Sequence, residues 1–197
     1  MSPDHPDYTA DLMIRKKRLL IDRHQVAFGN RSIPTSQITG IRWGILIKYT
    51  NGVRTNRSFL VSVCTTQGTS LNMECHSKFF SLGLDEKNWL AFQTMINSCL
   101  ANVVPRIVQI ISSRLTGGET VQVGPCRLDR EGLHFTKGAL FWKEERFISW
   151  KHVGFDAENG MVIVYDPRVR KCRTSMSARG TWNAVLLEFI ASAMREQ

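Results

Sequence analysis

The sequence predicts an α+β protein, mainly β, in which two similar series of short strands each end in an amphipathic helix. Three observations predict this class. Short apolar runs alternate with tight-turn signals, including Asn51-Gly52 and Asn159-Gly160, as in antiparallel strands. Apolar residues recur at helical spacing near the end of each half. The order of strands and helix is the same in both halves.

The first half is predicted to be an antiparallel meander. Residues 1–13 are mostly polar and are expected to form a flexible tail. Residues 19–28 are expected to form two short strands around a polar corner that contains Asp22. Extended segments follow, and they are predicted over residues 33–43, 45–49, 58–64 and 71–75.

The longest helical pattern begins near Asp85, the expected N-cap, and ends before Gly117-Gly118. Pro105 lies inside the pattern and predicts either a kink or a break at which a second helix begins. The part after Pro105 exceeds what one small barrel can cover, so it is expected to pack on the second half or on another subunit. The apolar stripe consists of Trp89, Phe92, Ile96, Cys99, Val103, Ile107 and Ile110.

The second half is predicted to repeat this order. Short strands are expected over residues 121–123, 127–128, 133–135, 147–150, 153–155 and 161–165. Thr181 is expected to cap a final helix. The predicted apolar face of this helix consists of Trp182, Val185, Leu186, Phe189, Ile190 and Ala193.

Three sets of residues match between the halves in the same order, which favours a diverged internal duplication. The matched sets are Ile21-Asp22-Arg23 with Leu128-Asp129-Arg130 (107 positions on), Ile33 and Ile38 with Ile148 and Val153 (115 on), and Trp89, Phe92 and Ile96 with Trp182, Val185 and Phe189 (93 on). The changing separation indicates loops of different length.

Each half, with about seven strands followed by one helix, resembles a pleckstrin-homology-like (PH-like or GRAM-like) unit. In such units the C-terminal helix closes one end of a bent β-barrel. Residues 118–195 are similar to uncharacterised bacterial PH-like proteins with a G-E-x-V-x-x-G … G-L … I-x-W-x-x-V run. The resemblance implies PH-like domains over residues 14–104 and 118–197, joined by a helical linker over residues 105–117. It also implies binding and scaffolding roles.

Positive charge is concentrated in the first half. Residues 15–57 contain ten Lys and Arg and one Asp, an excess that equals the net charge of +9 of the whole chain. This asymmetry indicates either an anionic partner or a solvated face that maintains solubility. The candidate residues for binding an anionic partner are Arg15, Lys16, Lys17, Arg18, Arg23, Arg31, Arg42, Arg168, Arg170 and Lys171.

The sequence does not predict catalysis, a metal or a cofactor. The five histidines lack metal-ligand spacing, and no G-x-S-x-G elbow or phosphate-binding loop occurs. The five cysteines are odd in number and scattered, which is typical of a reducing compartment. No apolar run is long enough to span a membrane. We therefore expect a non-enzymatic protein that is cytoplasmic or peripheral to the membrane.

Three functions fit these features. The first is a scaffold whose partner is an acidic protein surface or a second copy of the chain. The second is peripheral binding to anionic phospholipid through the basic residues. The third is nucleic-acid binding, for which Trp43 beside Arg42 and Trp142 beside Lys143 are the available pairs of an aromatic and a basic residue. No small-molecule substrate is expected.

Overall fold

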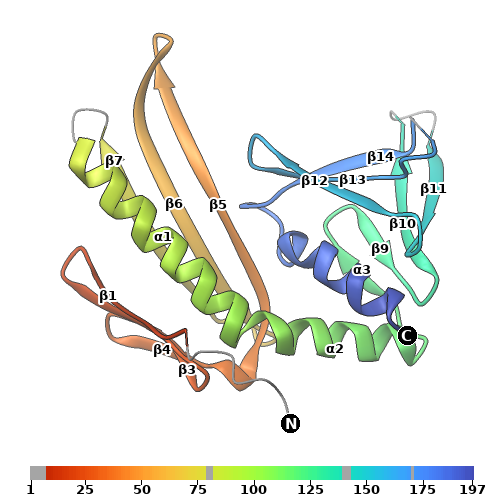
Figure 1. Ribbon diagram of the computed structural model, residues 1–197, viewed down its shortest axis with the longest axis horizontal. Coiled ribbons are helices and arrows are strands. Elements are labelled where there is room, and N and C mark those ends of the chain that lie inside the picture. The colour runs from red at the N-terminus through yellow and green to blue at the C-terminus, as the bar shows by residue number, and fades with distance from the viewer. Residues whose placement is uncertain (1–7, 79–81, 139–142, 170) are drawn as a thin grey trace. The chain divides into compact units, whose positions relative to one another are not determined.

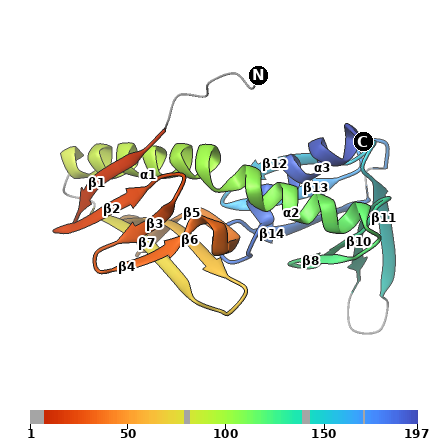
Figure 2. The same ribbon diagram turned by 90° about the horizontal axis from the view of Figure 1, so that it is seen from below.

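The computed structural model describes residues 8–78, 82–138, 143–169 and 171–197. The described chain is α+β and mainly β, with four antiparallel sheets and three α-helices, as the sequence predicts. It divides into two compact units, unit 1 (Met1–Ile107) and unit 2 (Val108–Gln197). Figures 1 and 2 show the elements of both units.

Unit 1 contains two antiparallel meanders followed by a helix. The four-stranded sheet has the order β1-β2-β3-β4, and the three-stranded sheet has the order β5-β6-β7. A 3₁₀ turn, η1 (Thr35–Gln37), joins the two sheets. The strands are β1 (Ala10–Ile14), β2 (Lys17–Ile21), β3 (Gln25–Phe28), β4 (Arg31–Pro34), β5 (Ile38–Thr50), β6 (Val53–Thr65) and β7 (Ser70–Lys78).

Two boundaries in unit 1 differ from the sequence prediction. Residues 10–13 are not part of a flexible tail, because Ala10 is buried and pairs with Ile21 in the sheet. Residues 33–43 and 45–49 are not two successive strands. The first four-stranded sheet ends at Pro34, and β5 then runs unbroken from Ile38 to Thr50, because β6 pairs with it along its length.

The long helical pattern forms two helices, α1 (Leu82–Asn102) and α2 (Val104–Thr116), so the break at Pro105 is the correct alternative. The two glycines end α2, with Gly118 in the left-handed region at φ 84°. Asp85 is not the N-cap, because α1 begins at Leu82. Its carboxylate accepts hydrogen bonds from Ser77 Oγ (2.5 Å) and Arg57 Nη1 (3.2 Å).

Helix α1 packs on β6 and β7 through aromatic side chains. Phe59 is fully buried, and its ring centroid lies 6.0 Å from that of Trp89 and 5.3 Å from that of Phe92. Cys99 is also fully buried and acts as a small core residue. The part of the predicted apolar stripe that lies on α1 therefore packs on the three-stranded sheet.

Unit 2 repeats the order of the elements, with shorter strands at most positions and longer ones at β10 and β11. Its sheets have the orders β11-β10-β9-β8 and β12-β13-β14. The elements are β8 (Val121–Val123), β9 (Cys126–Leu128), β10 (Gly132–Lys137), β11 (Glu144–Ser149), β12 (Gly154–Glu158), β13 (Met161–Tyr165), β14 (Arg173–Ser177), the 3₁₀ turn η2 (Ala184–Leu186) and α3 (Leu187–Arg195). The final helix is not capped by Thr181, and Trp182 precedes it in a turn. The match of the two helices at 93 positions is therefore wrong.

The strand pairing of unit 1 matches that of unit 2 at the same separations of 107 and 115 positions. In unit 1 Val26 pairs with Ile21 on one side and Ile33 on the other. In unit 2 Leu133, 107 positions on, pairs with Leu128 and Ile148. All six side chains are buried. Equivalent residues of the two halves thus occupy equivalent core positions.

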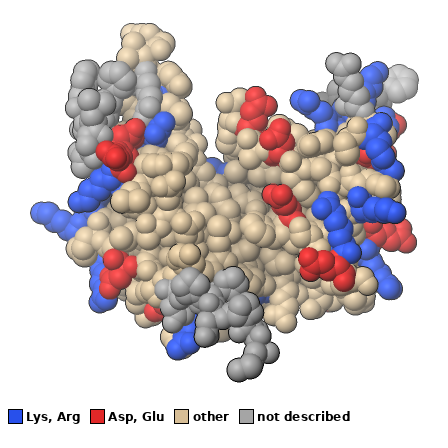
Figure 3. Space-filling model, viewed as in Figure 1, with Lys and Arg blue, Asp and Glu red and all other residues tan. Residues whose placement is uncertain are grey.

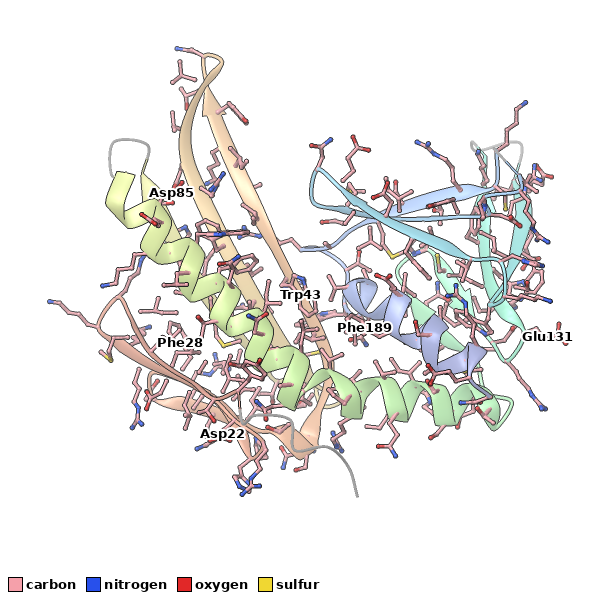
Figure 4. All side chains as sticks on the ribbon, viewed as in Figure 1. Asp22, Phe28, Trp43, Asp85, Glu131 and Phe189 are labelled. Carbon is pink, nitrogen blue, oxygen red and sulfur yellow. The ribbon has the colours of Figure 1, made fainter. Side chains whose placement is uncertain are left out.

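Each unit turns between its second and third strands at an aspartate. The Asp22 carboxylate accepts hydrogen bonds from the backbone N–H groups two and three residues further on, at 2.7 and 2.8 Å. Asp129 accepts the equivalent pair at 2.9 and 3.0 Å. Such bonds satisfy the N–H groups of a tight corner. Figure 4 labels Asp22 at one corner and Glu131 at the other.

Two further contacts repeat around these corners. The side chain of Thr35 donates to the carbonyl of Asp22 (3.2 Å), and Trp150 Nε1 donates to the carbonyl of Asp129 (3.0 Å). An arginine then closes each turn after the fourth strand. Arg106 donates to the carbonyls of residues 35 and 38, and Arg195 donates to those of residues 150 and 153.

Among the described residues, no single helix has the length and apolar character needed to cross a membrane. Only residues 85–102 and 104–116, taken together as a bent pair, meet that criterion.

Candidate anion-binding site

The first predicted basic cluster forms the β1–β2 hairpin of unit 1. Arg15 and Lys16 occupy its two-residue turn, with φ of 48° and 64°, as in a type I′ turn. Arg15 and Lys16 therefore lie in the turn, and Lys17 and Arg18 lie on β2. Lys17 Nζ lies 5.6 Å from the centroid of the Phe28 ring, and Arg18 makes a two-point ion pair with Asp11 at 2.6 and 2.9 Å.

This hairpin is longer than its counterpart in unit 2. Ala10 pairs with Ile21, and Val121 pairs with Leu128. From Ala10 to Ile21 the chain is thus four residues longer than from Val121 to Leu128. The basic cluster occupies this extension, which lengthens both strands. Unit 2 forms a sheet of the same order without it.

The other predicted residues of unit 1 lie in different places. Arg23 is exposed at the β2–β3 corner, at the opposite end of β2 from the basic hairpin, and donates to His24. Arg31 begins β4 opposite Phe28, at the same end as Lys17, and donates to the carbonyl of Ser70 (2.8 Å). Arg42 is half-buried on β5, in the other sheet.

The second predicted cluster follows β13 in unit 2. Arg168 binds Asp166 through two side-chain hydrogen bonds of 2.8 and 3.0 Å. These bonds lower the pKa of Asp166 to about 2. The charge of Arg168 is therefore largely neutralised. Lys171 is exposed in the same loop, and Arg170 lies outside the described residues.

Lys171 lines a basic pocket that the sequence did not predict. The pocket has a volume of about 540 Å³ and is open to solvent. Four cations and one carboxylate line it, and we call it the basic pocket. Its residues are Lys137, Gly138, Lys143, Glu144, Arg146 and Lys171.

Three elements bring these side chains together. Lys137 ends β10, and Glu144 and Arg146 lie on β11, which pairs with it. Lys137 Nζ donates to the carbonyl of Lys171 at 2.7 Å, which ties the β10–β11 hairpin to the β13–β14 loop. Arg146 donates to Glu144 at 2.5 Å. One carboxylate against four cations leaves the basic pocket with a net positive charge.

The thiol of Cys172 lies next to the basic pocket. Burial and the negative charges of Asp166 and Glu144 raise the pKa of Cys172, and the positive charges of Arg146 and Lys137 oppose this increase. These cations therefore lie close enough to act on Cys172 electrostatically. A site of this kind stabilises negative charge, because several cations lie around one hollow.

Unit 1 carries cations at the equivalent end of its fold. Arg31 corresponds to Arg146 at a separation of 115 positions, and each follows the turn between the third and fourth strands. Arg31 ties that turn to the β6–β7 turn, as Lys137 ties the β10–β11 hairpin to the β13–β14 loop. Figure 3 shows that on one face the cations of unit 2 are mixed with carboxylates.

The sequence did not single out Lys137 or Arg146, and it singled out Lys143 only beside Trp142, as a contact for nucleic acid. Lys143 and Arg146 flank Glu144-Glu145, so the charges of this run are mixed and do not indicate a binding site. The sequence feature that could have indicated the basic pocket is the β10–β11 hairpin. Pairing of these two strands brings Lys137 on β10 and Arg146 on β11 to the same pocket.

Other chemistry finds little support in the described residues. Burial raises the pKa of Cys75 to about 11 and those of Cys99 and Cys126 to about 12, so these thiols are poor nucleophiles. No group of three or more His, Cys, Asp or Glu side chains suitable for a metal ion occurs in this part of the chain. A second hollow of about 420 Å³, near Tyr8 and Pro105, has no charged lining residue.

No protein-family model matches this sequence, and no curated protein matches it either.

Proposed function

We propose that this chain is a non-enzymatic binding protein built of two PH-like units. The support is the repeated order of a four-stranded meander, a three-stranded meander and a helix. The repeated aspartate corners, strand registers and helix arginines add to it. An internal duplication of a PH-like domain accounts for these repeats.

The ligand proposed for unit 2 is an anionic group of the phosphate class, bound in the basic pocket. The observation that carries this proposal is the convergence of four cations on one open hollow with a single carboxylate. Lysine ammonium groups bind phosphate as point charges, and an arginine adds directed N–H donors. The group is carried either by a soluble molecule or by a lipid, which would make the protein peripheral to a membrane.

Calorimetric titration with pyrophosphate tests this function. Lys143 and Lys171 are the variants of choice, because no described side-chain hydrogen bond of the fold uses their ammonium groups. We expect Lys143→Ala/Lys171→Ala to bind at least about tenfold more weakly, since each cation near an anion contributes about 1 kcal/mol. The affinity of the unchanged protein should also fall with salt.

The matched control is Lys151→Ala, which removes an exposed lysine of unit 2 outside the basic pocket. It should leave pyrophosphate binding unchanged. Equal affinity of the double variant and the unchanged protein would refute the proposed site. Vesicles containing phosphatidic acid, compared with free pyrophosphate, distinguish a lipid-borne group from a soluble one.

A further inference from the structure

The β5–β6 hairpin of unit 1 is much longer than its counterpart in unit 2. Strands β5 and β6 have 13 residues each, whereas β12 and β13 have five each. Both hairpins turn at an Asn-Gly pair with nearly equal φ angles, 52° and 77° against 51° and 76°. Unit 2 thus completes the same sheet without the additional length. We call residues 46–57 of unit 1 the arm; Figure 1 shows it projecting beyond the helix.

The base of the arm belongs to the core, and its tip does not. Phe59 is buried against α1, and Arg57 pairs with Asp85 in the first turn of that helix. Arg57 lies opposite Ile47, so the chain between these two residues extends past the ion pair. Figure 4 shows Asp85 near the beginning of the helix, beside the arm.

Apolar side chains are exposed on both faces of the arm. The exposed fractions are 41% for Leu46, 38% for Ile47, 63% for Tyr49 and 54% for Val53. Leu46 and Ile47 are neighbours on one strand, so they point to opposite faces. A flat protein surface would cover one face only. Insertion into an apolar medium covers both.

The charge of the arm is entirely positive. Residues 46–57 include Lys48 and two arginines, and no Asp or Glu occurs between Asp22 and Glu74. The space-filling view shows no acidic side chain at the top of the arm (Figure 3). A membrane surface rich in anionic lipid complements this combination. Tyrosine prefers the interface, lysine keeps its charge at the headgroups, and apolar residues enter the acyl region.

We propose that the arm inserts its tip, with Tyr49 and Val53, into the interface of an anionic bilayer. This surface lies on unit 1 and does not depend on ligand binding in the basic pocket of unit 2. It assigns a reason to the part of the additional strand length that extends past the contacts with α1.

Vesicle flotation of the full chain tests the proposal. The probes are phosphatidylcholine vesicles with and without phosphatidylglycerol. The protein should float with the anionic vesicles, and Tyr49→Ser/Val53→Ser should bind them about tenfold or more weakly, because its tip no longer offers apolar area. Lys48→Gln should weaken binding to the anionic vesicles by a smaller factor, and added salt should reduce that difference.

Leu90→Ser is the matched control, because Leu90 lies on α1 of the same unit and is 63% exposed, as is Tyr49. It should bind like the unchanged protein, and circular dichroism should show the same fold for all variants. The proposal is overturned if the unchanged protein does not float, or if the Tyr49/Val53 variant floats equally well. A dimer in solution that dissociates on the Tyr49/Val53 substitution would assign the arm to a second copy instead. The Tyr49/Val53 variant should bind pyrophosphate as the unchanged protein does. Its loss of vesicle binding would then be independent of anion binding in the basic pocket.

Discussion

Asp22 and Asp129 each organise a corner by accepting two backbone hydrogen bonds. The sequence shows this role, because an apolar residue, an aspartate and an arginine recur at both places. A short carboxylate that bonds to its own backbone depends only on neighbouring residues. Features of this local kind were predictable.

The charged side chains were harder to predict, because an ion pair depends on the paired strand. Arg18 and Arg168 are neutralised by Asp11 and Asp166, which removes two of the candidate binding residues from full availability. The exposed pair of Arg18 with Asp11 contributes little stability, whereas the carboxylate of Asp166 is buried. The two ion pairs determine which arginines remain available to bind a ligand.

Asp166 gives the protein an acid-sensitive contact. Hydrogen bonds from Arg168 lower the pKa of Asp166 from 3.8 to about 2 in the folded state. A carboxyl group with a lowered folded pKa stabilises the fold above its unfolded pKa. That stabilisation is lost as the pH falls from about 3.8 towards 2. We expect Asp166→Asn to show a smaller loss of stability over this interval.

Urea unfolding midpoints measured above and below the ordinary carboxyl pKa check this expectation. The control is Asp156→Asn, which changes an exposed aspartate of the same unit. If Asp166→Asn lost as much stability in acid as the unchanged protein, the Arg168 contact would not contribute to acid sensitivity.

At the level of elements, the positions of the turns were predictable and some strand ends were not. Asn51-Gly52 and Asn159-Gly160 turn as their sequence predicts, because only such residues adopt both left-handed angles easily. The continuity of β5 was missed, since it depends on pairing with β6. Trp182 was placed on the last helix because its spacing is helical, although the helix begins at Leu187.

Helix α3 depends on an arginine at its C-terminal end. With nine residues, it is too short to be stable by itself. Arg195 donates to the carbonyls of Trp150 and Val153 at 2.7 and 2.6 Å, which ties the helix to the loop after β11. We expect Arg195→Met to destabilise the protein by about 2–3 kcal/mol, because it removes two charge-assisted hydrogen bonds.

Chemical denaturation measures this effect. Arg173→Met is a suitable comparison, because Arg173 is exposed on β14 of the same unit. Its substitution should change the free energy of unfolding by less than about 0.5 kcal/mol. Similar values for the two variants would mean that the Arg195 contacts do not hold the helix in place.

At the scale of the whole molecule, the protein has a net charge of +9. Some of its lysines and arginines form ion pairs, and others lie in the basic hairpin, the arm and the basic pocket. The sequence indicates the excess and its concentration in residues 15–57. It does not indicate the pocket, because Lys137 and Lys171 are 34 residues apart and meet only when the strands pair.

Because the two units repeat the same order of elements, features that they share can be distinguished from features that only one of them has. The shared registers identify what the fold requires, and the longer basic hairpin and the arm identify what unit 1 adds. The additions carry exposed cations and apolar side chains, which are typical of interaction surfaces.

Amide NMR spectra recorded during a pyrophosphate titration test the proposed function most directly. We predict saturable shifts at Lys137, Arg146 and Lys171, weaker at higher salt, with little change at the Asp22 and Asp129 corners. No saturable shifts, or shifts spread evenly over exposed lysines such as Lys87 and Lys151, would contradict a specific anion site in unit 2.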